Sequence, residues 1–210
     1  MPAEPSTIDD LPALRVLLGE PTAVVASKVA DRLHPETRRF IELSPFLCLA
    51  TSSPDGRCDV SPRGDPAGFV RILDERRLLL PDRPGNRIAD SLRNILVNPH
   101  VGLLFLIPGI GDTFRVNGRA TIVDDQELLR PSAVGGSVPR IGILVAIEEA
   151  YTQCSKALIR SDLWNPEHRR DRTELASAGE ILRAVRGDAF DAATYDRERD
   201  ERYARGDGLY

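Results

Sequence analysis

The feature that most constrains the fold is a series of short apolar segments, separated by tight turns, between residues 46 and 150. In the first of them, "FLCLATS" is followed by the turn residues Pro54, Asp55 and Gly56, and "CDVSP" then resumes the chain, which predicts a β-hairpin. Further strand candidates are residues 67–73, 77–81, 100–107, 113–123 and 140–150. Short strands joined by tight turns and interrupted by one helix favour a closed or nearly closed antiparallel barrel.

The pair Asn117–Gly118 lies within the longest of these segments, "TFRVNGRATIV". An Asn-Gly pair is typical of a two-residue hairpin turn. The apolar pattern continues on both sides of the pair, so a G1-type β-bulge within one long, bent strand fits the sequence better.

Helical patterns precede and follow the barrel segment. Three helices are predicted between about residues 8 and 44, and "RTELASAGEILRAVRG" predicts an amphipathic helix that ends at Gly187. We therefore expect an N-terminal helical extension (1–44), the barrel (45–165), and a C-terminal helix with a charged tail (166–210) that packs on the barrel or on a partner.

Composition argues against several classes of function. A net charge of −4 gives no support for nucleic-acid or membrane-surface binding, and no apolar run has the length of a membrane-spanning helix. Three cysteines and three histidines lie far apart, so neither a disulfide framework, a metal site nor a catalytic triad is expected. The polar, acidic N-terminus lacks the pattern of a secretory signal, which predicts a cytoplasmic protein.

The segment "PDRPGNRIADSLRNI" (81–95) predicts a glycine turn opening into a helix, with Asn86 as N-cap and Arg87 as the first helical residue. Ile88, Leu92 and Ile95 recur at helical spacing and predict a buried face. A cation at a helix N-terminus is unfavourable unless it holds an anion there, and free backbone N–H groups with an arginine would suit a phosphate. A surface arginine with its head in water is the alternative, and both stay open.

Two further segments contain candidate ligand-binding residues. In "CDVSPRGDPAGFVRIL", a proline interrupts a predicted strand, and Arg63 and Arg71 add positive charge; an ordinary loop is the alternative. In "QCSKALIRSDLW", Lys156 and Arg160 share one helical face near Trp164, the single tryptophan, a residue type that is more often part of the core than a ligand platform.

In their order along the chain, "SPRGD", "PDRPGNR…DSLRNI…NP", "RVNGRA" and "CSKALIRSDLW" resemble the pyridoxamine 5'-phosphate oxidase-like, FMN-binding split-barrel superfamily. The resemblance covers roughly residues 44 to 165, and more narrowly the chain is similar to a bacterial subgroup of FMN-dependent enzymes. It implies a mainly-β fold with flanking helices, a six-stranded antiparallel split β-barrel, and a homodimer with FMN at the subunit interface.

The resemblance also implies roles for individual residues. It implies a phosphate site at Asn86, Arg87 and Ser91, with Asp82 lining the ribityl chain. Further positions that it implies are Arg63 and Arg71 at the phosphate and flavin ring, Thr113 reaching FMN from the second subunit, and Lys156, Arg160 and Trp164 closing the cleft from the partner chain or contacting substrate.

The implied function is an FMN-dependent oxidoreductase that transfers hydride between bound FMN and an unidentified small molecule, with NADH or NADPH as candidate donor. "GNRIADS" replaces the Ser-Arg-Lys type cluster of the oxidases proper, and their C-terminal substrate-binding segment is not evident, so a vitamin B6 phosphate substrate is not expected. No catalytic side chain is assigned, because flavin supplies the chemistry. The alternatives are a non-catalytic flavin-binding or flavin-sensing protein, and a split barrel that binds haem or a deazaflavin.

Overall fold

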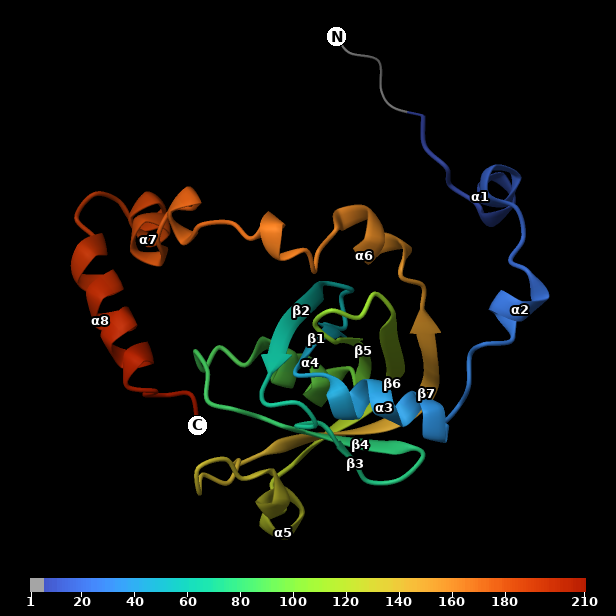
Figure 1. Ribbon diagram of the computed structural model, residues 1–210, viewed down its shortest axis with the longest axis horizontal. Helices are drawn as coiled ribbons and strands as arrows, with labels where there is room; N and C mark the ends of the chain where they lie inside the picture. Colours follow the sequence, from blue (N-terminus) through green and yellow to red (C-terminus); the bar gives the residue numbers. More distant parts are fainter. Residues whose placement is uncertain (1–5) are drawn as a thin grey trace.

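Residues 46–153 form the antiparallel sheet that the sequence predicts, as shown by a computed structural model that describes residues 6–210 (Figure 1). The strands are β1 (Phe46–Ser52), β2 (Cys58–Gly64), β3 (Arg71–Ile72), β4 (Arg77–Pro81), β5 (His100–Leu106), β6 (Thr113–Val123) and β7 (Gly142–Gln153). Their order in the sheet is β2-β1-β5-β6-β7-β4-β3. The predicted β1–β2 and β3–β4 hairpins are both present.

Residues 6–210 also contain eight α-helices. They are α1 (Leu11–Leu18), α2 (Ala23–Ala26), α3 (Pro35–Leu43), α4 (Asp90–Val97), α5 (Gln126–Leu129), α6 (Lys156–Ser161), α7 (Ala178–Arg186) and α8 (Ala192–Ala204). Short 3-10 turns occupy Arg130–Ser132, Pro166–His168 and Arg172–Glu174. None of these helices is long and apolar enough to cross a membrane, within residues 6–210.

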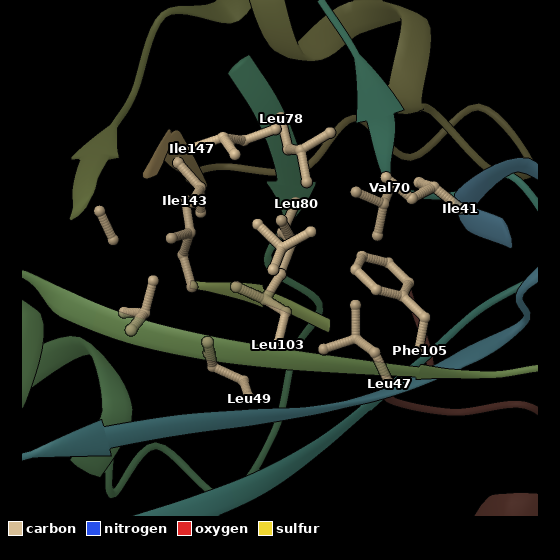
Figure 2. Close-up of a cluster of buried hydrophobic side chains, with 14 of the residues drawn as sticks. Ile41, Leu47, Leu49, Val70, Leu78, Leu80, Leu103, Phe105, Ile143 and Ile147 are labelled. Carbon is tan, nitrogen blue, oxygen red and sulfur yellow. The ribbon is translucent and has the colours of Figure 1, made fainter. Parts of the chain in front are cut away.

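The sheet curls so that its two halves share one core. Leu47 and Leu49 of β1 point toward Leu78 and Leu80 of β4, although three strands separate β1 from β4 in the sheet order, and Phe105 of β5 joins the same cluster (Figure 2). All of these side chains are at most 1% exposed. Burial of large aliphatic and aromatic groups is worth about 1.5–3 kcal/mol per side chain, so this core is the main stabiliser of the fold.

The sheet has seven strands, one for each strand candidate of the sequence, rather than the six that the resemblance implies, and it is not closed by a β2–β3 pair. The shortest strand, β3, contains two residues, although the sequence predicted a strand over 67–73. The shorter pairing has a local cause: Phe69 N donates to the carbonyl of Pro66, and Gly68 lies in the left-handed region with φ 84°. This turn bends the chain away from the ladder. The architecture is a mainly-β, curled antiparallel sheet consistent with a split barrel.

The Asn117–Gly118 pair lies within continuous β6, so the hairpin alternative is excluded. The strand register shifts there, because Asn117 pairs with Glu149 and Gly118 with Ile147, which leaves Glu148 of β7 as the extra residue. The bulge is therefore on the partner strand, and Gly118 does not adopt the left-handed conformation of a G1 bulge. Glycine is needed for a different reason: a Cβ at this position would overlap the carbonyl of Ala146.

The two ends of the chain extend away from the sheet. Figure 1 shows α1 and α2 on one side and the α7–α8 hairpin on the other. Within the hairpin, Gly179 of α7 and Ala192 of α8 are the buried residues. A side chain at Gly179 would meet the backbone of Ala192, so the two helices approach closely at this point.

Candidate functional site

Strand β2 presents polar side chains on its covered face. Asp59, Ser61 and Arg63 alternate with exposed neighbours and are each half-buried, because side chains two apart in a strand point to the same face. β2 is an edge strand, which is where a proline such as Pro62 is tolerated within a ladder.

The segment opposite β2 enters its helix later than the sequence predicts. α4 begins at Asp90 with Ala89 as N-cap, not at Arg87 with Asn86 as N-cap. The Asn86 side chain instead accepts a hydrogen bond from Ile88 N (3.0 Å), and Arg87 and Ala89 both adopt positive φ, 63° and 61°. Asp90 is thus the first helical residue, and its negative charge is the kind that a helix N-terminus favours. Ile88 is 56% exposed rather than part of the buried face, which contains Ser91 and Ile95.

A cavity of about 480 Å³ lies between β2, the end of β4 and this segment; we call it the β2 cavity. Its lining comprises Asp59, Val60, Ser61, Pro62, Arg63, Gly64, Phe69, Pro81, Arg83, Pro84, Gly85, Asn86, Ile88, Ala89, Asp90 and Ser91. No side chain caps the N-terminus of α4, which opens at this cavity. Helix N-terminal N–H groups without a cap are available to an anionic ligand.

Asp59 and Ser91 fix α4 against β2. The Ser91 hydroxyl donates to Asp59 Oδ2 (2.9 Å), and Thr51 of β1 donates to the same oxygen at 3.4 Å. Asn94 Nδ2 in turn donates to Thr51 Oγ1 (3.0 Å). The sequence analysis missed Asp59, although its alternation with Ser61 and Arg63 along β2 was the available signal.

Arg63 forms an ion pair with Asp82 just after β4, at 2.6 Å between Nη1 and Oδ1. The two side chains are 21% and 18% exposed. Among the described residues, the buried Nε of Arg63 has no hydrogen-bond acceptor. A buried donor without an acceptor is costly, so Arg63 retains one N–H that a bound ligand could satisfy.

Arg83 forms the second ion pair of this region, with Asp65 at 2.6 Å, and Asp65 is 1% exposed. Arg83 also donates to the Ser132 carbonyl (2.8 Å) and lies 5.2 Å from the ring centre of Tyr210. The Tyr210 hydroxyl donates to Asp65 (2.9 Å), which raises the pKa of that hydroxyl because the nearby carboxylate stabilises its protonated form. This cluster, Asp65, Arg83 and Tyr210, joins the C-terminal segment to the site, and the sequence analysis missed it.

A second cavity, of about 590 Å³, shares residues 83–85 of its lining with the β2 cavity; we call it the loop cavity. Its lining comprises Asp82, Arg83, Pro84, Gly85, Arg87, Ser137, Val138, Pro139, Arg140, Ile141, Gly208 and Tyr210. Arg87, which the sequence analysis placed at the flavin phosphate, lines this cavity and is not among the residues that line the β2 cavity.

Three of the other predicted site residues therefore meet at the β2 cavity: Arg63, Asn86 and Ser91, with Asp82 attached through its ion pair to Arg63. The remaining ones do not line it. Arg71 Nη1 donates to the Leu128 carbonyl (2.6 Å), Thr113 is buried at the start of β6, Lys156 and Arg160 are exposed on α6, and Trp164 Nε1 donates to the Ile110 carbonyl (2.8 Å). The role of Arg71 at the phosphate and flavin ring stays a prediction, as do the roles of the other four residues toward a partner subunit.

Comparison with known proteins gives one family match. The model of the family described as pyridoxamine 5'-phosphate oxidase matches residues 33–154. Curated protein sequences gave no match.

Several solved structures are similar to part of this chain. A putative pyridoxamine 5'-phosphate oxidase from Lactobacillus delbrueckii is 21% identical with a TM-score of 0.46, covering 58% of this chain and 95% of that chain. An FMN-binding protein from Syntrophomonas wolfei is 12% identical with a TM-score of 0.41 (56% and 88% covered). The heme storage protein HutZ from Vibrio cholerae is 19% identical with a TM-score of 0.40 (59% and 94% covered).

Proposed function

The chain belongs to the pyridoxamine 5'-phosphate oxidase family, and from that premise we propose that it binds FMN in the β2 cavity and acts as a flavin-dependent oxidoreductase on a small molecule. The observation that carries the proposal is the unpaired, buried Nε of Arg63 beside an uncapped helix N-terminus in one cavity. A phosphate would satisfy both sets of donors, since guanidinium and helix N–H groups both favour an anion.

Within this proposal each side chain has a separate task. Arg63 and the first N–H groups of α4 hold the phosphate, and Asp82 orients the Arg63 guanidinium through its ion pair. The Ser91–Asp59 hydrogen bond keeps the start of α4 against β2, so the donors stay aligned. Bound FMN would supply the redox chemistry, accepting and donating hydride, while the protein binds and orients it.

The proposal extends to assembly. We propose that residues 45–165 form a split barrel, with residues 1–44 and 166–210 as its end segments, and that the chain is a homodimer. In the dimer, the partner's flavin site is completed by Thr113, Lys156, Arg160 and Trp164. Both end segments have exposed apolar residues, among them Val16 at 86% exposure and Val185 at 80%. Such surfaces are typical of contacts with another protein chain, which supports the dimer proposal.

FMN titration followed by quenching of flavin fluorescence tests the binding proposal. Arg63→Ala removes a charge-assisted phosphate contact worth about 1.5–3 kcal/mol, so we expect FMN affinity to fall about ten- to a hundredfold. Arg57→Ala is the matched control, because Arg57 lies just before β2 and is 87% exposed. A folded protein that takes up no FMN, or an Arg63→Ala variant with unchanged affinity, would contradict the proposal.

Turnover is tested separately from binding. Anaerobic mixing of the FMN-loaded protein with NADH or NADPH should bleach the flavin absorbance in a stopped-flow experiment. If neither donor reduces the flavin, and if small quinones and nitro compounds do not reoxidise a chemically reduced sample, the protein is a non-catalytic flavin binder or sensor.

Mass spectrometry of the extracted ligand distinguishes FMN from haem or a deazaflavin. Haem iron is held by His, Cys, Met or Tyr, and none of these is among the residues that line the β2 cavity. A deazaflavin in place of FMN would leave the phosphate assignment to Arg63 without support.

A further inference from the structure

We propose that the loop cavity is a second ligand site, which takes a small organic anion with an apolar body and holds its charged group between Arg87 and Arg140. This inference goes beyond the flavin proposal, because it concerns a different cavity with its own residues. The cavity of about 590 Å³ has the size that small-molecule sites commonly have.

The walls come from three separate parts of the chain. Residues 82–87 form one wall, the segment 137–141 that leads into β7 forms another, and Gly208 and Tyr210 bring in the C-terminal segment. Tyr210 is held there by its hydrogen bond to Asp65 and by its position over Arg83. The cavity is therefore assembled by long-range contacts rather than being a groove within one loop.

Two of the four charged residues in the lining are already neutralised. Asp82 is paired with Arg63, and Arg83 is paired with Asp65, each at 2.6 Å. Arg87 and Arg140 form no ion pair within residues 6–210. The cavity thus has two uncompensated positive charges, from two different loops, and favours an anion.

The backbone conformation of Arg87 is a second, independent observation that favours a binding site here. Arg87 has φ 63°, a conformation that non-glycine residues rarely adopt and that costs of order 1–3 kcal/mol. The Asn86 side chain supports the strained turn through its bond to Ile88 N. Such strain persists at binding sites, and in this chain it accompanies an arginine that lines the loop cavity instead of starting α4.

The remaining lining indicates the rest of the ligand. Val138, Pro139 and Ile141 offer apolar surface, and the Tyr210 ring adds an aromatic group. Two guanidinium groups can each make paired hydrogen bonds to a carboxylate or a phosphate. The ligand class is therefore an aryl or alkyl carboxylate or phosphate, and not a bare inorganic ion.

Isothermal titration of the full chain, saturated with FMN, tests the assignment with three probes that share a phenyl ring: phenyl phosphate, benzoate and benzyl alcohol. We expect at least one of the two anions to bind, and benzyl alcohol to bind at least about tenfold more weakly, because it lacks the charge. The stronger of the two anions identifies the charged group as phosphate or carboxylate.

The variant Arg87→Ala/Arg140→Ala should weaken anion binding at least about tenfold. Arg169→Ala/Arg183→Ala is the matched control, since both arginines are exposed and lie outside both cavities. All four side chains are exposed, so both double variants should keep the parent melting temperature.

Three results would overturn the proposal: no binding of either anion, equal binding by the Arg87→Ala/Arg140→Ala variant, or equal binding of benzyl alcohol. A loss of FMN affinity in that variant would also overturn it, because the two arginines would then hold the flavin. Failure of the flavin proposal is recognised independently, by the FMN titration and by Arg63→Ala, and the same anion titrations then apply to the flavin-free chain.

Discussion

In the curled sheet, the side chains that join distant strands are aliphatic or aromatic and fully buried, and Phe114 packs between Phe40 and Phe105. In the α7–α8 hairpin, the buried residues are Gly179 and Ala192, and the defined contacts combine polar groups with one aromatic pair, Phe190–Tyr195. Asp196 accepts a hydrogen bond from Gly179 N (2.8 Å), and Ser177 and Glu180 form a capping box. The sheet is held by buried apolar side chains, whereas in the hairpin hydrogen bonds to carboxylates join the two helices and cap them.

The comparison teaches where each kind of perturbation should act. Burial is insensitive to the protonation of surface carboxylates but sensitive to the loss of side-chain volume. Hydrogen bonds to carboxylates respond in the opposite way, because their strength depends on the charge of the acceptor. We therefore expect loss of side-chain volume to act mainly on the sheet, and protonation of carboxylates to act mainly on the hairpin.

The largest effect is expected for Phe114→Ala in β6. Phe114 is fully buried and stacks on Phe40 with ring centres 5.5 Å apart, so truncation leaves a cavity in the core. We expect a loss of about 3–5 kcal/mol in the free energy of unfolding, measured by urea denaturation. Val185→Ala in α7, at 80% exposure, should leave this free energy nearly unchanged. A similar loss in both variants would contradict the assignment of stability to the sheet core.

An intermediate effect is expected when acid is added. Hydrogen bonds from the Ser177 hydroxyl and Gly179 N lower the pKa of Asp196, so its contribution is present above the unfolded value of about 4 and is lost as pH falls through the lower folded value. The pKa values of Asp171 and Asp191 are lowered in the same way, by contacts with Thr173 and Thr194. We therefore expect amide chemical shifts of α7 and α8 to move toward coil values below pH 4, before those of β6 change.

The variant Asp196→Asn serves as the control for this acid transition. It retains a carbonyl acceptor for Gly179 N but has no charge to lose, so it should shift less between neutral and acidic pH than the parent chain does. Simultaneous loss of α7–α8 and β6 signals on acidification would show that the two regions are one cooperative unit.

The smallest effect is expected for Tyr210→Phe. Tyr210 joins the C-terminal segment to Asp65, just after β2. The substitution removes the hydroxyl that donates to Asp65 but keeps a ring over Arg83. Hydrogen exchange of residues 205–210 should quicken while the midpoint of global unfolding stays the same. In the parent chain the pKa of Tyr210 is raised, so the contact is complete below about pH 10 and is lost as pH rises through the folded value. Unchanged hydrogen exchange of residues 205–210 would show that the Tyr210–Asp65 hydrogen bond does not hold the C-terminal segment in place.

Local features of the sheet could be predicted from the sequence, because short strands and turns are encoded by neighbouring residues. The hairpin around Gly56 and the unbroken strand through Gly118 both follow from alternation and turn chemistry. The start of α4 could not be predicted in this way. An asparagine before a helix can cap it or close a turn on its own backbone, and Asn86 closes the turn.

The candidate site was predictable only in part, for a related reason. Arg63, Asn86 and Ser91 lie in segments that the sequence marks as irregular, and they do meet at one cavity. The pairs Arg63–Asp82, Arg83–Asp65 and Tyr210–Asp65 join residues 19, 18 and 145 positions apart. No spacing rule connects such partners, so the ion pairs that neutralise Asp82 and Arg83 emerge only from the folded chain.

Residues 83–85 line both the β2 cavity and the loop cavity, so a single strip of backbone is common to both. Occupancy of one cavity and occupancy of the other are then subject to thermodynamic linkage. Any factor by which a ligand in the loop cavity tightens or weakens flavin binding must equal the factor by which the flavin changes the affinity for that ligand. These three shared residues are the part of the chain through which such a coupling would be transmitted.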